Sequence, residues 1–425
     1  MNKSLQEISE YYFERFGYAS GRLEPALDPS TKMIIVIPVH NEPDLAETLN
    51  SLNRCDRADT PVEVIVVVNN SEDAENSVRE QNLKSIDEIN SWIQDNPDSR
   101  ISCNVMSAMN LPAKHAGVGL ARKIGMDAAL RRFATINYNG LIVCLDADCT
   151  VHPSYLKELE SNFCTENFVA GNIYYEHPLA GDIEATPSGI GKYELGLRYY
   201  VNALRFAGYP YSYHTIGSSM AVSAITYAKS GGMNKRKAGE DFYFLHKLIP
   251  LGGFRELNST AVYPSSRISE RVPFGTGLAM LRWQKQISSG QSHELESYCF
   301  KTFRDLKEFI ASIIALRECT GKVTYTNAVK TLPHSIQEFL MSQNFYDVLN
   351  SCIAQSTSEA AYLKRIYAWL DGFMVLKFVH FARAHFYPEV PVEQCARELL
   401  GSIHVNSDGS DGVLLETYRE LDRSR

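Results

Sequence analysis

Short runs of almost wholly apolar residues recur through the first part of the chain, and each has the length of a strand. They cover residues 33–39, 62–68, 101–106 and 141–145. Continuous apolar runs, as opposed to alternating ones, are typical of strands that are buried on both faces. The pattern therefore predicts an α/β fold with a mainly parallel sheet flanked by helices.

The segments between these runs have the periodicity of helices. Apolar residues recur at helical spacing within residues 44–53 and 119–133. A short amphipathic stretch lies within residues 1–30, before Pro25 and Pro29, and we interpret it as a helix that covers the domain behind it.

From about Glu294 the pattern changes to helical periodicity with no convincing strand. We predict helices over residues 301–317, 334–355, 358–387 and 392–403. The predicted organisation is a helical extension (1–30), an α/β domain (31–290), an all-helical C-terminal domain (291–405) and a polar tail (406–425).

Composition narrows the class of protein. Of 425 residues, 44% are hydrophobic and 22% are charged, which is typical of a globular protein. The net charge is -8, so there is no basic excess to neutralise a nucleic-acid backbone, and we expect no nucleic-acid partner. The N-terminus lacks the apolar core of a signal peptide, and the nine cysteines contain no Cys-x-x-Cys pair. We therefore expect a cytoplasmic enzyme with reduced thiols.

Polar residues follow several of the predicted strands, where an open parallel sheet binds its ligands. Asn41 and Glu42 come after the first apolar run, and Asn69 and Asn70 after the second. Each pair taken alone is ambiguous, because a polar turn after a strand is commonplace.

Two carboxylates, Asp146 and Asp148, follow the apolar run that ends at Leu145. Residues i and i+2 of an extended backbone point the same way, and clustered carboxylates need a compensating cation. Hard oxygen ligands suit Mg²⁺ or Mn²⁺ together with phosphate oxygens. The alternative is that both residues merely end a strand and cap the helix that follows Pro153.

A second acidic pair, Glu240 and Asp241, opens a helical stretch. Carboxylates are favoured in the first turn of a helix, so capping alone would explain the pair. The order and spacing of the four polar clusters carry more information than any one of them.

Taken as a series, these motifs resemble a family 2 glycosyltransferase with the GT-A fold. The resemblance covers roughly residues 31–250 and does not reach the helical C-terminal domain. It rests on five motifs in the same order, which are IIVIPVHNE (34–42), VVVNNS (66–71), GLARKIG (119–125), Asp146-Ala-Asp148 and Glu240-Asp241.

The resemblance implies a site for a nucleotide-diphospho sugar, with a UDP-sugar favoured. Pro38, Asn41 and Glu42 would hold the base and the ribose, and Arg122 would contact the base or the diphosphate. Where the family commonly has two aspartates after the second strand, this chain has Asn69 and Asn70. The identity of the nucleotide is therefore open.

The resemblance also implies roles for the acidic residues. Asp148 would be the direct ligand of Mn²⁺ or Mg²⁺, with Asp146 nearer the ribose and also near the metal. Asp241 matches the general base of inverting members, and Glu240 would position the acceptor or support Asp241. The two could exchange roles.

A later segment, residues 265–277, contains Arg267 and Arg271, followed by Gly275 and Gly277. Two arginines on a loop with hinge-capable glycines suit a lid that clamps a diphosphate. An exposed basic loop is the alternative.

The acceptor is left open by the sequence as a glycan, a lipid-linked glycan or a small molecule. An aromatic stretch over residues 362–387 would give peripheral membrane contact if the acceptor is lipid-linked. The alternatives are the core of the helical domain or a dimer interface, and we favour the core. The oligomeric state is not predicted.

Three other functions compete. Asp146-Ala-Asp148-Cys149-Thr150 also fits haloacid-dehalogenase-like phosphatases, with Asp146 as nucleophile, but the later Asp of their acidic motif is missing after Asp241. A sugar-phosphate nucleotidyltransferase would need a glycine-rich loop after the first strand, where Glu42 and its neighbours contain none. A non-catalytic nucleotide-sugar-binding protein is the third alternative.

Overall fold

The computed structural model describes residues 3–18, 23–97, 101–165, 167–179, 189–267, 283, 294–319, 321–406 and 408–425. The chain divides into two compact units, and each is described by itself. Unit 1 comprises Met1–Pro178, Thr215–Leu281 and Asp422–Arg425, and unit 2 comprises Leu179–His214 and Arg282–Leu421.

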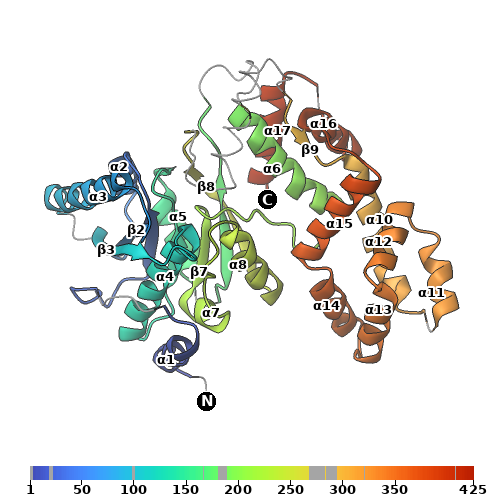
Figure 1. The fold of residues 1–425 in the computed structure, drawn as a ribbon, viewed down its shortest axis with the longest axis horizontal. Coiled ribbons are helices and arrows are strands. Elements are labelled where there is room, and N and C mark those ends of the chain that lie inside the picture. The colour runs from blue at the N-terminus through green and yellow to red at the C-terminus, as the bar shows by residue number, and fades with distance from the viewer. Residues whose placement is uncertain are drawn as a thin grey trace. The chain divides into compact units, whose positions relative to one another are not determined.

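Unit 1 is built on an eight-stranded sheet with the order β3-β2-β1-β4-β7-β6-β8-β5 (Figure 1). Parallel pairing joins β3, β2, β1 and β4, and also β6 with β8, whereas β7 and β5 pair antiparallel to their neighbours. This confirms the predicted mainly parallel sheet. The strands are β1 (Met33–Val39), β2 (Val62–Ser71), β3 (Ile101–Leu111), β4 (Leu141–Cys144), β5 (Thr150–Val151), β6 (Ala170–Tyr175), β7 (Met220–Ser223) and β8 (Phe254–Tyr263).

The four predicted apolar runs form β1, β2, β3 and β4. Every residue of β1 is buried, as expected for a strand covered on both faces. Strand β2 runs beyond its apolar part, because Asn69 stays paired with Ala108 of β3 and Ser71 with Leu111. The ladder thus continues into residues whose side chains are polar.

Helices flank the sheet of unit 1, as predicted. They are α1 (Leu5–Arg15), α2 (Leu45–Asn53), α3 (Asn76–Asp95), α4 (Val118–Thr135), α5 (Tyr155–Phe163), α7 (Ala224–Lys229) and α8 (Glu240–Leu248), which continues into a 3-10 turn at Ile249–Leu251. Helix α4 packs on β1 and β2 and is buried along most of its length. A side-chain carbon at Gly125 would collide with Val36 and come within 3.0 Å of Val67, so this glycine allows the close approach.

Helix α1 is tied to α4 and α7 by a buried polar cluster. The Tyr12 and Tyr227 hydroxyls each donate to Asp127 Oδ1 at 2.6 Å. Lys123 Nζ lies 2.7 Å from the Tyr12 hydroxyl and 3.3 Å from Asp127 Oδ2. The N-terminal extension is therefore anchored through charged groups that the sheet domain buries.

The variant Tyr12→Phe should lower the free energy of unfolding by about 1–3 kcal/mol, because it leaves Asp127 and Lys123 short of a buried hydrogen-bond partner. Urea unfolding measures the change. The neighbouring Tyr11 is 48% exposed, so Tyr11→Phe is the matched control and should stay within about 0.5 kcal/mol of wild type. Equal effects of the two variants would contradict a stabilising role for the cluster.

Unit 2 is mainly helical. Its helices are α6 (Gly189–Phe206), α10 (Phe300–Leu316), α11 (Lys322–Val329), α12 (His334–Ser342), α13 (Phe345–Ala354), α14 (Glu359–Trp369), α15 (Gly372–His385), α16 (Val392–Ser402) and α17 (Asp411–Arg423), of which the last two residues are assigned to unit 1. It also contains a short antiparallel pair of strands, β9 (Glu296–Ser297) and β10 (Val390–Pro391). The pattern of apolar residues does not predict this pair, because two-residue strands have no detectable period.

Two predicted long helices are each broken in the structure. The segment 334–355 is interrupted at Asn344, whose φ of 51° is left-handed. The segment 358–387 is interrupted where Asp371 caps α15 by accepting a hydrogen bond from the backbone N–H of Met374 at 2.8 Å. Asparagine and aspartate are the residue types that end and start helices in this way.

The aromatic stretch over residues 362–387 supplies the core of unit 2. Tyr362, Phe378 and Val379 are buried together with residues of α10, α12 and α16. This agrees with the interpretation of the stretch as core. Within the described part of the chain, no helix is both long and apolar enough to cross a membrane.

The segment predicted as a polar tail contains helix α17. Leu414, Leu415 and Tyr418 are buried, with each at most 2% exposed. Their spacing places them on one side of a helix. Because charged residues lie among them, this apolar stripe was not recognised in the sequence. Arg419 of α17 forms an ion pair with Glu194 of α6, at 2.8 Å between Nε and Oε1.

Candidate active site

The carboxyl ends of β2, β1 and β4 lie side by side, since the three strands are parallel neighbours. The turn after β1, the end of β2 and the loop after β4 therefore meet at one edge of the sheet, where such sheets bind ligands. Pro38 lies inside β1, paired with Val67.

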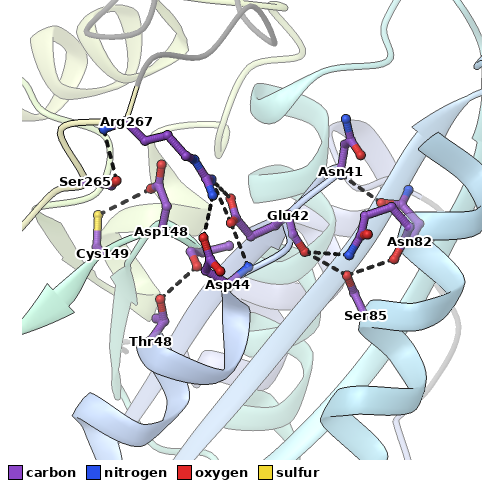
Figure 2. A network of polar contacts seen from close by, with 12 residues as sticks. Asn41, Glu42, Asp44, Thr48, Asn82, Ser85, Asp148, Cys149, Ser265 and Arg267 are labelled. Atoms are coloured by element: carbon purple, nitrogen blue, oxygen red, sulfur yellow. Dashed lines mark hydrogen bonds and ion pairs between the residues drawn. The ribbon is translucent and has the colours of Figure 1, made fainter. Parts of the chain in front are cut away.

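The turn after β1 holds an arginine from a distant loop (Figure 2). Arg267 Nη2 lies 2.7 Å from both carboxylate oxygens of Glu42, and its Nη1 lies 2.7 Å from Asp44 Oδ2. Burial alone would lower the pKa of Arg267, but the carboxylates of Glu42, Asp148 and Asp44 outweigh it and raise the pKa. Glu42, expected at the nucleotide, thus orients Arg267 beside the Asp148 loop.

An amide network fixes the same turn against the end of β2. The Asn41 backbone N–H donates to Asn82 Oδ1 at 2.9 Å, and Asn82 Nδ2 donates to the Asn69 carbonyl at 2.8 Å. Asn69 Nδ2 in turn donates to the Val39 carbonyl at 2.8 Å. Asn41 has a φ of 51°, a conformation that asparagine tolerates well. Asn82, in the middle of α3, had no motif in the sequence to reveal it.

Asn69 and Asn70 are both buried at the end of β2. Asn70 Nδ2 donates to the Ser71 carbonyl at 2.7 Å. Its Oδ1 has no hydrogen-bond partner within the residues that the structure describes. This amide oxygen is an acceptor at the edge of the sheet where the polar loops meet.

Arg122, in the second turn of α4, joins the two acidic pairs. One guanidinium nitrogen contacts Asp146 Oδ1 and the other contacts Glu240 Oε1. The Arg122 side chain is 4% exposed, whereas that of Asp146 is 35% exposed. Burial opposes the charge of Arg122, but the neighbouring carboxylates of Asp146 and Glu240 raise its pKa.

The acidic pair of α8 has perturbed acidity. Burial raises the pKa of Glu240 to about 7, with Arg122 opposing the rise and Asp241 adding to it. Burial likewise raises the pKa of Asp241, with Arg122 opposing. Asp241 accepts a hydrogen bond from the backbone N–H of Phe242 at 2.7 Å. A carboxyl group with raised pKa at a ligand-binding edge is suited to proton transfer.

The donor set at this edge fits a hard divalent cation. The network holds the acidic residues Glu42, Asp44, Asp146, Asp148, Glu240 and Asp241 against the two guanidinium groups of Arg122 and Arg267. Negative charge is therefore in excess. Carboxylate oxygens are the hard ligands that Mg²⁺ and Mn²⁺ prefer. Among the described residues, no three His, Cys, Asp or Glu side chains lie close enough together to hold a metal ion by themselves.

The structure thus brings together Asp146, Arg122 and Glu240, and separately Glu42 and Arg267. Arg271, and the rest of the predicted lid beyond Arg267, lie outside the described residues.

No family model matches the sequence, and no curated protein matches it. Among solved structures, S. aureus TarS 1–349 in complex with UDP-GlcNAc aligns over 92% of this chain and 91% of its own, at 14% identity and a TM-score of 0.36. GalNAc-T7 with UDP, GalNAc and Mn²⁺ aligns over 84% of this chain and 58% of its own, at 14% identity and a TM-score of 0.36. At such TM-scores the likeness carries no argument about function.

Proposed function

We propose that this protein is a metal-dependent, inverting glycosyltransferase of the GT-A type. It transfers a sugar from a nucleotide-diphospho sugar to an acceptor hydroxyl. The observation that carries the proposal is the meeting of Asp146 and Glu240 on the guanidinium of Arg122. Two acidic pairs that resemble the metal-binding and base motifs of family 2 glycosyltransferases thereby share one site.

The leaving nucleoside diphosphate gains negative charge as the sugar–phosphate bond breaks. Asp148, supported by Asp146, would hold Mn²⁺ or Mg²⁺, and the bound cation supplies charge neutralisation at the diphosphate. Arg267 is oriented by Glu42 beside Asp148, and its side chain is 31% exposed. Unlike a buried arginine, it can therefore offer a second positive charge to the same phosphates.

The acceptor hydroxyl loses its proton as its oxygen attacks the anomeric carbon. Asp241 takes this proton, and its raised pKa makes it a better base than an exposed aspartate. The new carbon–oxygen bond forms on the face opposite the breaking sugar–phosphate bond, so one displacement inverts the anomeric carbon. The donor we favour is a UDP-sugar, and the acceptor is a glycan, a lipid-linked glycan or a small molecule.

A thermal-shift panel with UDP, GDP, dTDP and CDP, each with and without Mn²⁺, tests the proposal. A nucleotide present at about 100 times its Kd stabilises the folded state by about 2.7 kcal/mol and raises Tm. We expect one nucleotide to raise Tm of the wild type only with metal, and Asp148→Ala to abolish the shift. Asp87→Ala, at an exposed position of α3, is the control and should keep it.

If no nucleotide raises Tm with metal, the proposed donor site is wrong. A shift with a phosphate mimic alone would favour the phosphatase alternative. If Asp148→Ala keeps the full metal-dependent shift, Asp148 is not the metal ligand.

A further inference from the structure

The guanidinium of Arg122 lies between the loop after β4 and the start of α8. Resting on the proposed function, we infer that Arg122 is a positioning residue that sets Asp241 at a fixed place relative to Asp146, and that it does not itself bind the nucleotide. This differs from the contact to base or diphosphate that the sequence resemblance implies.

The exposure of the side chains supports this assignment. Asp146 is 35% exposed on its side chain, so a ligand can reach it, whereas Arg122 at 4% and Glu240 at 3% are covered. Both terminal nitrogens of Arg122 already contact carboxylates. A diphosphate would have to displace one of these buried ion pairs to reach the guanidinium.

Two glycines lie directly against the ion pair between Arg122 and Glu240. A side-chain carbon at Gly217 would lie 2.5 Å, 2.6 Å and 2.7 Å from Nη1, Nη2 and Cζ of Arg122. A side-chain carbon at Gly119 would lie 2.9 Å from Cβ of Glu240 and collide with the Arg236 carbonyl. The guanidinium therefore packs directly on the backbone at Gly217, and a side chain at this position would displace it.

Asp241 is held within its own helix. Its carboxylate accepts a hydrogen bond from the backbone N–H of Phe242 at 2.7 Å, whereas Gly217 supports the neighbouring guanidinium of Arg122 through its bare Cα. Arg122 contacts Asp146 on one side and Glu240 on the other. A displaced guanidinium would therefore change the distance between the loop after β4, which holds the proposed metal ligands, and the proposed base Asp241.

Arginine suits this role and lysine does not. A guanidinium presents several donors in a rigid plane and can hold two carboxylates at once, whereas an ammonium is a point charge on a flexible stem. A lysine would still attract a diphosphate, so Arg122→Lys separates positioning from direct phosphate binding.

The test compares Arg122→Lys, Arg122→Met and Gly217→Ala with wild type. The readouts are kcat and KM for the donor, and the Kd of the nucleotide diphosphate with metal. If Arg122 is a positioning residue, kcat should fall by about 100-fold in all three variants, since small misplacements of reacting groups have effects of that size. Nucleotide affinity then changes by less than about fivefold, and Gly217→Ala loses turnover although it keeps the arginine.

Two controls separate this role from general stability. Gly401→Ala adds a methyl group where nothing lies within 4 Å, and it should behave as wild type. Tyr12→Phe weakens the buried cluster that contains Lys123, the residue after Arg122, but it changes no residue of the candidate site. This variant should therefore keep the wild-type kcat per folded molecule.

Three results would overturn the inference. An affinity loss of tenfold or more in Arg122→Met that Arg122→Lys restores would mean direct phosphate binding. Unchanged kcat in Gly217→Ala with lowered Tm would mean a structural role only. If the wild-type protein transfers sugar from none of the nucleotide-diphospho-sugar donors, the proposed function is refuted, and the inference about Arg122 is refuted with it.

Discussion

Replacing Asp241 with asparagine is expected to lower turnover by about 10²–10⁴-fold, the usual contribution of a general base. Asparagine has nearly the same shape but does not accept a proton at neutral pH. The affinity for nucleotide and metal should change by less than about threefold, because Asp241 sits on α8 and the proposed metal ligands sit in the loop after β4. Steady-state kinetics with the donor identified by thermal shift, together with its Kd, measures both quantities.

The exposed Asp87→Asn is the matched control, since it removes a carboxylate of the same type far from any proposed role. Turnover of Asp241→Asn within about threefold of wild type would show that another group takes the proton, with Glu240 as the first candidate. Loss of nucleotide binding in the same variant would show that Asp241 contacts the donor instead.

Glu194→Ala is expected to lower the free energy of unfolding of unit 2 by about 3–5 kcal/mol. Glu194 is fully buried in α6, with Arg198 Nε and Arg419 Nε each 2.8 Å from its Oε1, and Arg419 Nη2 3.0 Å from Oε2. Removing one partner of a buried ion pair leaves uncompensated charge, and that is why the loss is large. Urea unfolding followed by circular dichroism measures it.

The control is Glu308→Ala, at an exposed position of α10, which should change the free energy of unfolding by less than about 0.5 kcal/mol. If Glu194→Ala behaves like this control, Arg419 does not bind α17 to α6 in solution. If the larger loss is found, residues 411–421 belong to the folded unit, and a chain truncated before them should unfold more readily.

The sheet of unit 1 was largely predictable because its buried strands are continuous apolar runs, and β1 has the predicted bounds. Helix α2 was predictable because Leu45, Leu49 and Leu52 recur at helical spacing and form its buried side. The breaks at Asn344 and Asp371 were not, because helical periodicity continues across them and the chain direction changes only through local backbone conformation.

The residues of the candidate site were predictable as types and positions, but their contacts were not. Asp146 and Glu240 each belong to an acidic pair at the end of a predicted element, and the sequence shows both pairs. Their shared contact with Arg122 depends on how α4 and α8 pack. Likewise nothing in the sequence connects Arg267 with Glu42, because the two residues are distant in the chain and meet only in the folded protein.

The close approach of α4 to β1 at Gly125 limits how this sequence can diverge. Any side chain there would push the helix away from Val36 and Val67, and Arg122 lies one turn earlier on the same helix. A relative that keeps every polar residue of the site but has a larger residue at this position would carry a displaced arginine. Relatedness in activity should therefore be judged by this apolar contact as well as by the acidic motifs.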